Sequence, residues 1–194
     1  MKEITERQLE IIEASSKLLT QGGVSGLTIK NIAKEMEFSE SAVYRHFKSK
    51  EEIIIAMLNY LSESMNIRLS KICSSDNSAK QRLINVFESQ LDFFESNPNF
   101  VVAVFSDGLF EESQKINEAI QRIMAVNMKN LIPVVAEGQV KGEFINTMIP
   151  EELMHIVMGS FRLQMYKWRI SNMKFDIQTE GKRVLNNIIK LITL

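Results

Sequence analysis

The sequence predicts an all-α protein with about nine helices, in which three short N-terminal helices precede a larger helical body. Three observations support this fold class. Only 3 Pro and 8 Gly interrupt the 194 residues, so the segments between them are long enough for helices. Apolar residues recur at helical spacing in nearly every segment, with no convincing alternating strand pattern. Ser and Thr residues stand where several of these segments begin, as helix N-caps do.

The first element is a helix that begins after Thr5. Thr5 and Gln8 form a capping-box pattern, in which each side chain binds the other residue's backbone amide. Leu9, Ile12 and Leu19 follow at helical spacing. We expect the pair of glycines at 22–23 to end this helix.

The next two helices are short and lie close together in the sequence. Thr28 is a candidate N-cap for a helix of about two turns. Ser39 is the N-cap candidate of a second one, and Phe38 before it can pack on Val43 as a hydrophobic staple. Ser49, with Glu52 three residues later, is a second capping box and begins a long linker helix over about 50–72.

The rest of the chain predicts five further helices. We expect Pro133 to kink or break the helix over 111–137. Their expected ranges are 78–97, 98–105, 111–137, 150–171 and 176–193. The chain then divides into an N-terminal domain over 1–48 and a C-terminal domain over 49–194.

Residues 28–47 have the arrangement of a helix-turn-helix unit, with two short helices separated by a turn of three or four residues. We expect Ile29, Ile32, Val43 and Phe47 to fill its core. Polar residues of the second helix lie off that apolar side, where they can face the major groove of DNA. These residues are Glu40, Ser41, Tyr44 and Arg45.

Charge is distributed in the direction that DNA binding requires. The net charge of the whole chain is -1, which by itself argues against a generally basic nucleic-acid coat or a polybasic membrane anchor. Residues 27–50 carry five Lys or Arg and three Glu, a local charge of +2. Residues 51–194 carry 15 basic and 17 acidic side chains. The positive charge is therefore concentrated in the helix-turn-helix unit.

At this unit the sequence resembles the TetR family of bacterial transcriptional regulators. The matching residues are Leu-Thr-Ile at 27–29, Ile-Ala at 32–33, Ser39 and Tyr44-x-His46-Phe47-Lys48-Ser49-Lys50-Glu51. The resemblance covers about residues 5–55. It implies an all-helical repressor with a C-terminal ligand-binding and dimerisation domain. It also implies binding to a palindromic double-stranded DNA operator as a homodimer, and release when a small molecule enters the C-terminal domain.

The resemblance also implies roles for single residues. Thr28 and Ser39 look like helix caps that contact phosphates. His46 and Lys50 look like further phosphate contacts. Tyr44 is similar to a family tyrosine that packs on the DNA backbone or a thymine methyl. Ser41 and Arg45 are candidates for base readout. The full predicted DNA-binding set is Thr28, Ser39, Glu40, Ser41, Tyr44, Arg45, His46, Lys48 and Lys50. Packing of Tyr44 and His46 within the small domain, and simple solvation of the lysines, are the alternatives.

Two residues depart from the family pattern. Many members have glycine in the turn between the two short helices, where this chain has Glu37. A left-handed Glu37 would carry strain of about 1 kcal/mol. Many members also have Lys or Arg followed by Gly where Glu40 and Ser41 stand. Glu40 either repels phosphate or accepts a hydrogen bond from a cytosine amino group.

Methionine and aromatic residues indicate where an effector binds. The chain has 11 Met, and several of them share helix faces with aromatic residues. Such side chains adapt to varied ligands, so they predict a deformable pocket for a small apolar or amphipathic effector. The predicted effector-binding residues are Phe105, Met124, Met128, Met158, Phe161, Met165 and Trp168. Packing in the core or at a dimer interface is the alternative for each of them.

We expect the homodimer to form through the last two helices, at about 150–171 and 176–193. Their apolar residues would be exposed in the monomer and covered in the dimer. The expected seam consists of Val184, Leu185, Ile188, Ile189 and Ile192. Ligand binding would move the linker helix and so change the separation of the two reading helices.

The chain lacks the residue patterns that enzymes and metal or cofactor sites need. Two histidines and Cys73 supply no metal-ligand cluster, and no catalytic or phosphate-loop motif is present, so we expect neither an enzyme nor a metal or cofactor site. His155 is interpreted as structural. The single cysteine, the polar N-terminus and the short apolar runs favour a soluble cytoplasmic protein with no membrane segment. A helix-turn-helix protein that acts mainly through a protein partner remains the alternative function.

Overall fold

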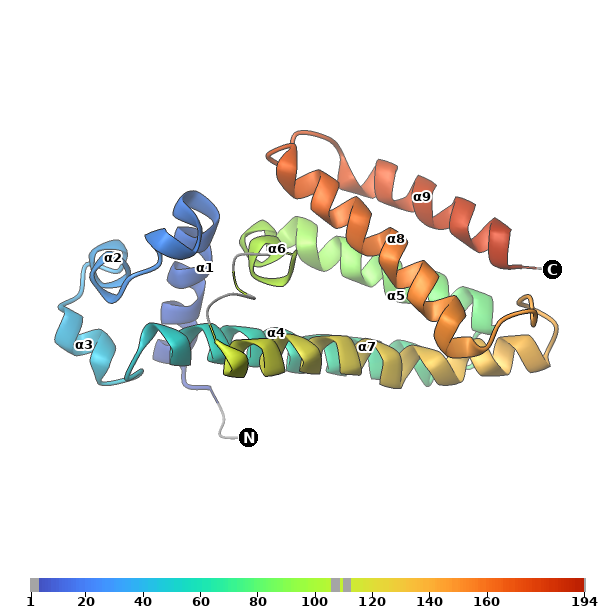
Figure 1. The fold of residues 1–194 in the computed structure, drawn as a ribbon, viewed down its shortest axis with the longest axis horizontal. Helices are drawn as coiled ribbons and strands as arrows, with labels where there is room; N and C mark the ends of the chain where they lie inside the picture. The colour runs from blue at the N-terminus through green and yellow to red at the C-terminus, as the bar shows by residue number, and fades with distance from the viewer. Residues whose placement is uncertain (1–3, 106–108, 110–112, 194) are drawn as a thin grey trace. The chain divides into compact units, whose positions relative to one another are not determined.

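The computed structural model describes residues 4–105, 109 and 113–193, and within them it is helical apart from turns and one isolated bridge between Phe144 and Thr193. The all-α fold class is therefore confirmed (Figure 1). The helices of the described residues are α1 (Glu6–Gly26), α2 (Ile29–Glu35), α3 (Glu40–Tyr44), α4 (Lys50–Cys73), α5 (Ala79–Ser96), α6 (Pro98–Phe105), α7 (Gln114–Val140), α8 (Pro150–Ile170) and α9 (Ile177–Ile192).

Packing divides the chain into two compact units. The first, which we call the N-terminal unit, combines Met1–Glu63 with Asn99–Ile123. The second, the C-terminal unit, combines Ser64–Pro98 with Met124–Leu194. The boundaries fall within α4, after the first residue of α6, and within α7, so α4 and α7 each contribute several turns to both units. The expected domain boundary at residue 48 stays a prediction.

The helix starts of the N-terminal unit follow the capping residues. The Thr5 hydroxyl accepts from the Gln8 amide at 3.3 Å, and the Gln8 side chain accepts from the Thr5 amide at 3.1 Å, which confirms the capping box of α1. Ahead of α4, the Ser49 hydroxyl accepts from the Glu52 amide at 3.1 Å. The Glu52 carboxylate accepts from the Lys48 amide at 2.7 Å, one residue earlier than in a standard capping box.

Glycine and proline interrupt α1 and α7 less than expected. The helical assignment of α1 continues to Gly26, although Gly23 itself has a non-helical backbone with φ 63° and ψ -164°. Of the kink or break predicted at Pro133, the break is wrong, because α7 continues to Val140, and the kink stays a prediction. Leu131, Val134 and Val135 are buried on both sides of the proline, and this packing holds the helix where one intrahelical hydrogen bond is lost. The expected start at Glu111 lies outside the described residues.

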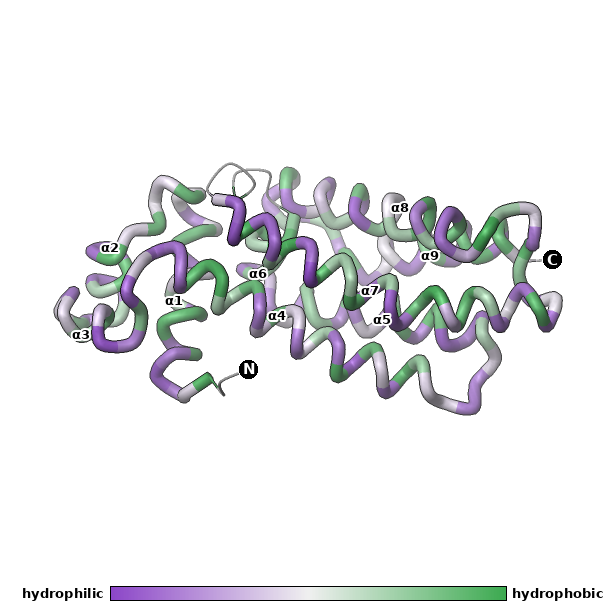
Figure 2. Tube along the Cα trace, turned by 60° about the horizontal axis from the view of Figure 1, so that its bottom comes forward, coloured by the Kyte–Doolittle hydropathy of each residue, from purple (hydrophilic) through white to green (hydrophobic). Residues whose placement is uncertain are grey.

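In the C-terminal unit α9 packs against α5 and α8 (Figure 1), and hydrophobic and hydrophilic positions alternate along the helices (Figure 2). Gly181 allows α9 to approach α5 closely, since a Cβ atom there would lie 2.8 Å from the Leu91 side chain. The expectation that the α9 seam is exposed in the monomer is wrong for Leu185, Ile189 and Ile192, which are buried. The apolar face of α9 is used within the protomer, and only Val184 and Ile188 of the seam are half-buried.

The turn between α2 and α3 is a Schellman motif. The Phe38 amide donates to the Ala33 carbonyl at 2.8 Å, and the Glu37 amide donates to the Lys34 carbonyl at 3.2 Å. Glu37 occupies the position that glycine usually takes, with φ 56°. The strain expected at this residue is therefore present in the turn that sets the start of α3.

We predict that Glu37→Gly stabilises the protein by about 0.5–1 kcal/mol, because glycine adopts a left-handed backbone without strain. The midpoint of urea unfolding, followed by circular dichroism, measures the change. Lys34→Gly, at an exposed helical position one turn earlier, is the matched control and should destabilise by about 1 kcal/mol. An unchanged or lower midpoint for Glu37→Gly would contradict the strain.

Candidate nucleic-acid interface

Helix α3 is held by two buried side chains and presents its other residues to solvent. Val43 is fully buried and Phe47, just after the helix, is 5% exposed. Ala33 of α2 is also buried, so its small side chain lies in the packed region of the motif. Because a helix turns about 100° per residue, burying Val43 directs the residues one and two positions away, among them Tyr44 and Ser41, to other faces.

The polar residues predicted to contact DNA lie on the exposed side of this helix. The Tyr44 side chain is 50% exposed, which for an aromatic residue is unusual enough to suggest a partner. The exposed residues around it are Ser39, Glu40, Ser41, Arg45, His46 and Lys48. The structure therefore gathers most of the predicted DNA-binding set on one short stretch, although contact with DNA remains a prediction.

Capping side chains fix where the two short helices begin. The Thr28 hydroxyl accepts from the Asn31 amide at 3.1 Å, and the Asn31 side chain donates to the Gly26 carbonyl at 2.8 Å. The Ser39 hydroxyl accepts from the Ala42 amide at 3.2 Å and lies 2.9 Å from the Ser41 hydroxyl. Thr28 and Ser39 are both exposed, so neither cap is closed off from a ligand.

Contacts from α1 hold the motif in place. The Gln8 side chain donates to the His46 carbonyl at 3.4 Å, and the Arg7 guanidinium lies 5.0 Å from the centre of the Phe38 ring. Lys17 forms an ion pair with Glu35 at the end of α2. These contacts leave the side chain of His46 exposed while its backbone is anchored. Lys50, in the first turn of α4, is half-buried and has its own interactions.

The predicted effector residues are distributed over both units rather than around one cavity. Phe105 belongs to the N-terminal unit and the other six belong to the C-terminal unit. Met124 is 57% exposed, so it lies on the surface of α7. Trp168 is buried and its Nε1 donates to the Phe175 carbonyl at 3.0 Å, a contact that gives it a structural role. Met165 and Phe161 are buried, whereas Met128 and Met158 are half-buried.

Phe161 lines a small apolar cavity between α5, α8 and α9. Its ring centre lies 5.2 Å from that of Phe87, and Gln164 lines the same space. The cavity measures about 10 Å³, the size of one water molecule and far below a ligand pocket. An effector would therefore need to displace side chains before it could enter here.

Sequence reasoning missed a group of buried polar residues in the C-terminal unit. Arg68 of α4 donates to the Gln90 side chain of α5 at 2.8 Å, and its guanidinium lies 4.1 Å from the centre of the Phe93 ring. Gln90 also donates to the Met65 sulfur at 3.1 Å. Gln90 stands three residues after the buried Phe87, as Gln164 does after Phe161. The sequence did contain a signal for these residues: a polar side chain stands where helical periodicity places an apolar one.

Among the described residues, every helix is too short or too polar to span a membrane. No group of three or more His, Cys, Asp or Glu residues in those same segments is placed to hold a metal ion.

The sequence matches two family descriptions that together cover most of the chain. Residues 11–57 match "Bacterial regulatory proteins, tetR family", and residues 58–191 match "YsiA-like protein, C-terminal region". Curated relatives include nucleoid occlusion factors SlmA. The protein from Marinomonas sp. (strain MWYL1) is 23% identical over 171 residues, 82% of this chain and 87% of that protein. The one from Vibrio cholerae serotype O1 is 26% identical over 141 residues, covering 72% and 71% of the two chains.

Solved structures share the fold over nearly the whole chain. The regulator FadR from Bacillus subtilis, in complex with stearoyl-CoA, has a TM-score of 0.82 at 19% identity, covering 93% of this chain and 97% of its own. The ketosteroid regulator KstR2 of Mycobacterium tuberculosis has a TM-score of 0.82 at 20% identity, covering 99% and 97%. With both family descriptions matched and the helix-turn-helix unit in place, the protein belongs to the TetR family of bacterial transcriptional regulators.

Proposed function

We propose that the protein is a repressor that binds a palindromic DNA operator as a homodimer and is released by a small apolar or amphipathic effector. The observation that carries the DNA-binding part is the exposed side of α3, where a half-exposed Tyr44 stands among polar residues. Val43 and Phe47 hold this helix from behind, so it can enter a major groove as one rigid element.

Ser41 and Arg45 are the proposed base-reading residues. Both are exposed on α3, and an arginine can make two hydrogen bonds to one guanine. Glu40 would either repel phosphate or accept a hydrogen bond from a cytosine amino group. Tyr44 packs against the DNA backbone or a thymine methyl. The proposed phosphate contacts, which set the register on DNA without reading its sequence, are Thr28, Ser39, His46, Lys48 and Lys50.

Exposed apolar residues support a homodimer through α8 and α9. Ile156, Leu163 and Ile170 recur every seven residues on α8 and are 50%, 67% and 61% exposed. That spacing places them on one side of α8, and α9 adds Leu191, which is 77% exposed. We call this set the α8–α9 surface. A second copy of the chain would remove it from water.

The effector part of the proposal rests on chemistry shared with structural neighbours. FadR from Bacillus subtilis holds stearoyl-CoA, and KstR2 is a ketosteroid regulator, so both names point to ligands with a large apolar body. Phe161, Met165 and Met158 of α8 are the residues through which the C-terminal unit would contact such a body. The remaining proposed contacts are Phe105, Met124, Met128 and Trp168.

A second function is supported by the curated relatives. The SlmA proteins are named nucleoid occlusion factors rather than effector-controlled repressors. The small size of the cavity beside Phe161 also favours a protein whose activity on DNA depends on a protein partner. Effector-driven release of DNA separates the two functions, because a regulator of the second kind would keep its DNA in the presence of the small molecule.

For DNA binding, we predict that Tyr44→Ala and Lys50→Ala weaken operator affinity while the dimer stays intact. The plot of log affinity against log salt concentration has a negative slope. Loss of one phosphate contact in Lys50→Ala should make this slope shallower by about 1. The measurement is fluorescence anisotropy on DNA fragments that flank the protein's own gene, across salt concentrations. Lys71→Ala, an exposed lysine on α4, is the control. If no fragment is preferred, the proposed binding to a specific operator is wrong.

For dimerisation, we predict that Leu163→Glu produces monomers, because a charge in the middle of the α8–α9 surface cannot be covered without losing its hydration. Light scattering coupled to gel filtration gives the mass. Ile67→Glu places the same charge on another exposed apolar residue, 64% exposed on α4, and should leave the dimer unchanged. If Leu163→Glu stays dimeric, the interface lies elsewhere.

For the effector, we predict that stearoyl-CoA or a ketosteroid changes the fluorescence of Trp168, the single tryptophan, and releases operator DNA at the same concentrations. Trp168 is buried in the C-terminal unit, so its emission reports on the packing of that unit. Met165→Gln places a polar group in the proposed apolar contact and should weaken both responses. Binding of neither ligand by wild type, with operator binding intact, would favour the protein-partner function.

A further inference from the structure

The C-terminal unit contains a second hollow, whose chemistry differs from that of the apolar cavity. It is a groove of about 300 Å³ between the last turns of α4 and the second half of α7. This volume reaches the lower end of the range for small-molecule sites. The residues that line it include Ser70 of α4 and Ser74 just after it, Lys129 and Glu137 of α7, and Arg82 of α5.

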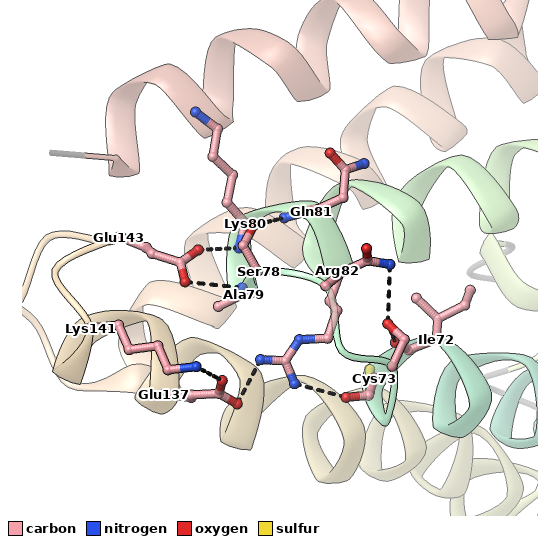
Figure 3. Close-up of polar contacts among 12 residues, drawn as sticks. Ile72, Cys73, Ser78, Ala79, Lys80, Gln81, Arg82, Glu137, Lys141 and Glu143 are labelled. Carbon is pink, nitrogen blue, oxygen red and sulfur yellow. Dashed lines mark hydrogen bonds and ion pairs between the residues drawn. The ribbon is translucent and has the colours of Figure 1, made fainter.

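Arg82 is a buried cation at this groove, held in place by two partners (Figure 3). Its side chain is 8% exposed, with one terminal nitrogen 2.6 Å from the Glu137 carboxylate and the other donating to the Cys73 carbonyl at 2.9 Å. Its Nε has no hydrogen-bond partner among the described residues. The buried guanidinium therefore keeps part of its hydrogen-bonding capacity unused.

The groove carries an excess of positive charge. Glu137 is shared by Arg82 and by Lys141, whose ammonium lies 2.6 Å away (Figure 3). Hydrogen bonds from these two cations lower the pKa of the Glu137 carboxyl to about 2, so it is ionised at neutral pH. One carboxylate thus faces two cations. Lys141 does not line the groove, but Lys129 does, and it has no ion-pair partner in the described part of the chain. The lining therefore holds two cations, Arg82 and Lys129, and one carboxylate, Glu137.

Two serine hydroxyls add hydrogen-bond donors to the groove. Ser70 donates to the Ile67 carbonyl at 3.2 Å, and Ser74, just after α4, donates to the Ser70 carbonyl at 2.5 Å. Serine hydroxyls rotate freely and make such local bonds when no better acceptor is present. Both serines lie at the end of α4, whereas Lys129 lies on α7, so the groove has donors from two segments of the chain.

We propose that this groove binds the phosphate group of a small phosphorylated molecule. Lys129 and the hydroxyls of Ser70 and Ser74 line the groove and can each donate a hydrogen bond to a phosphate oxygen. Arg82 adds a second cation to the lining. The site is separate from the proposed apolar effector contacts and from α3, and does not depend on the proposed function.

The single cysteine of the chain supplies a direct test. Cys73 lines the same groove and is half-buried, and burial raises the pKa of its thiol. A neutral reagent, N-ethylmaleimide, would label it at a rate that falls when a ligand covers the groove. With pyrophosphate or ADP at about ten times the dissociation constant, we expect labelling of wild type to slow about tenfold. Potassium chloride keeps the ionic strength constant.

A pair of lysine variants distinguishes the groove from general charge effects. Lys129→Gln should raise the concentration for half-protection about tenfold, because a hydrogen bond from a charged donor is lost. Lys71→Gln removes an equal charge from an exposed residue of α4 that does not line the groove, and should leave this concentration unchanged. ADP protecting at lower concentration than pyrophosphate would identify a nucleotide as the ligand class, and the reverse order an inorganic or simple phosphate ester.

Two results would overturn the site. One is a labelling rate that neither pyrophosphate nor ADP changes up to tens of millimolar. The other is an equal shift of the half-protecting concentration in Lys129→Gln and Lys71→Gln, which would mean that the anions act on the whole protein surface. Circular dichroism of both variants confirms that they are folded.

Discussion

The burial of Val43 and Phe47 is the interaction on which the DNA-reading part of the molecule depends. Helix α3 has five residues, far fewer than the roughly 12–15 that an isolated helix needs in water. It exists because these two side chains are packed in the N-terminal unit and because Ser39 caps its start. The same burial decides which residues of α3 remain exposed, and therefore which can read a groove.

Charged side chains in this protein serve structure as often as they serve recognition. The Glu52 carboxylate accepts from the Lys48 amide ahead of α4. At the start of α5, the carboxylate of Glu143 accepts from the Ala79 and Lys80 amides at 3.3 and 2.9 Å (Figure 3). Both place negative charge where a helix dipole is positive. Glu143 acts from more than sixty residues away, so it joins the segment after α7 to the start of α5.

The two halves of the proposed mechanism rest on different kinds of support. Recognition of DNA follows from a short motif whose backbone geometry, exposure and family agree. Control by an effector follows from residue chemistry and from the names of structural neighbours that share the fold. A shared fold does not by itself identify a ligand, because one fold hosts many functions. The buried Arg82 and Gln90, with the half-buried Arg68 that donates to Gln90, are where this chain differs from a plain apolar bundle.

Local signals alone determined the fold class and the reading motif. Several features depend only on contacts within a few residues, so the local sequence indicates them. They are the caps at Thr5, Thr28, Ser39 and Ser49 and the turn at the left-handed Glu37. Only tertiary packing decided that α7 passes through Pro133, that Leu185 faces its own protomer, and that Met124 lies at the surface. An apolar stripe on a helix shows that a face is covered but not what covers it, because the hydrophobic effect is non-directional. The contacts of Arg82 with Glu137 and of Ala79 with Glu143 join residues more than fifty positions apart, and no sequence period records them.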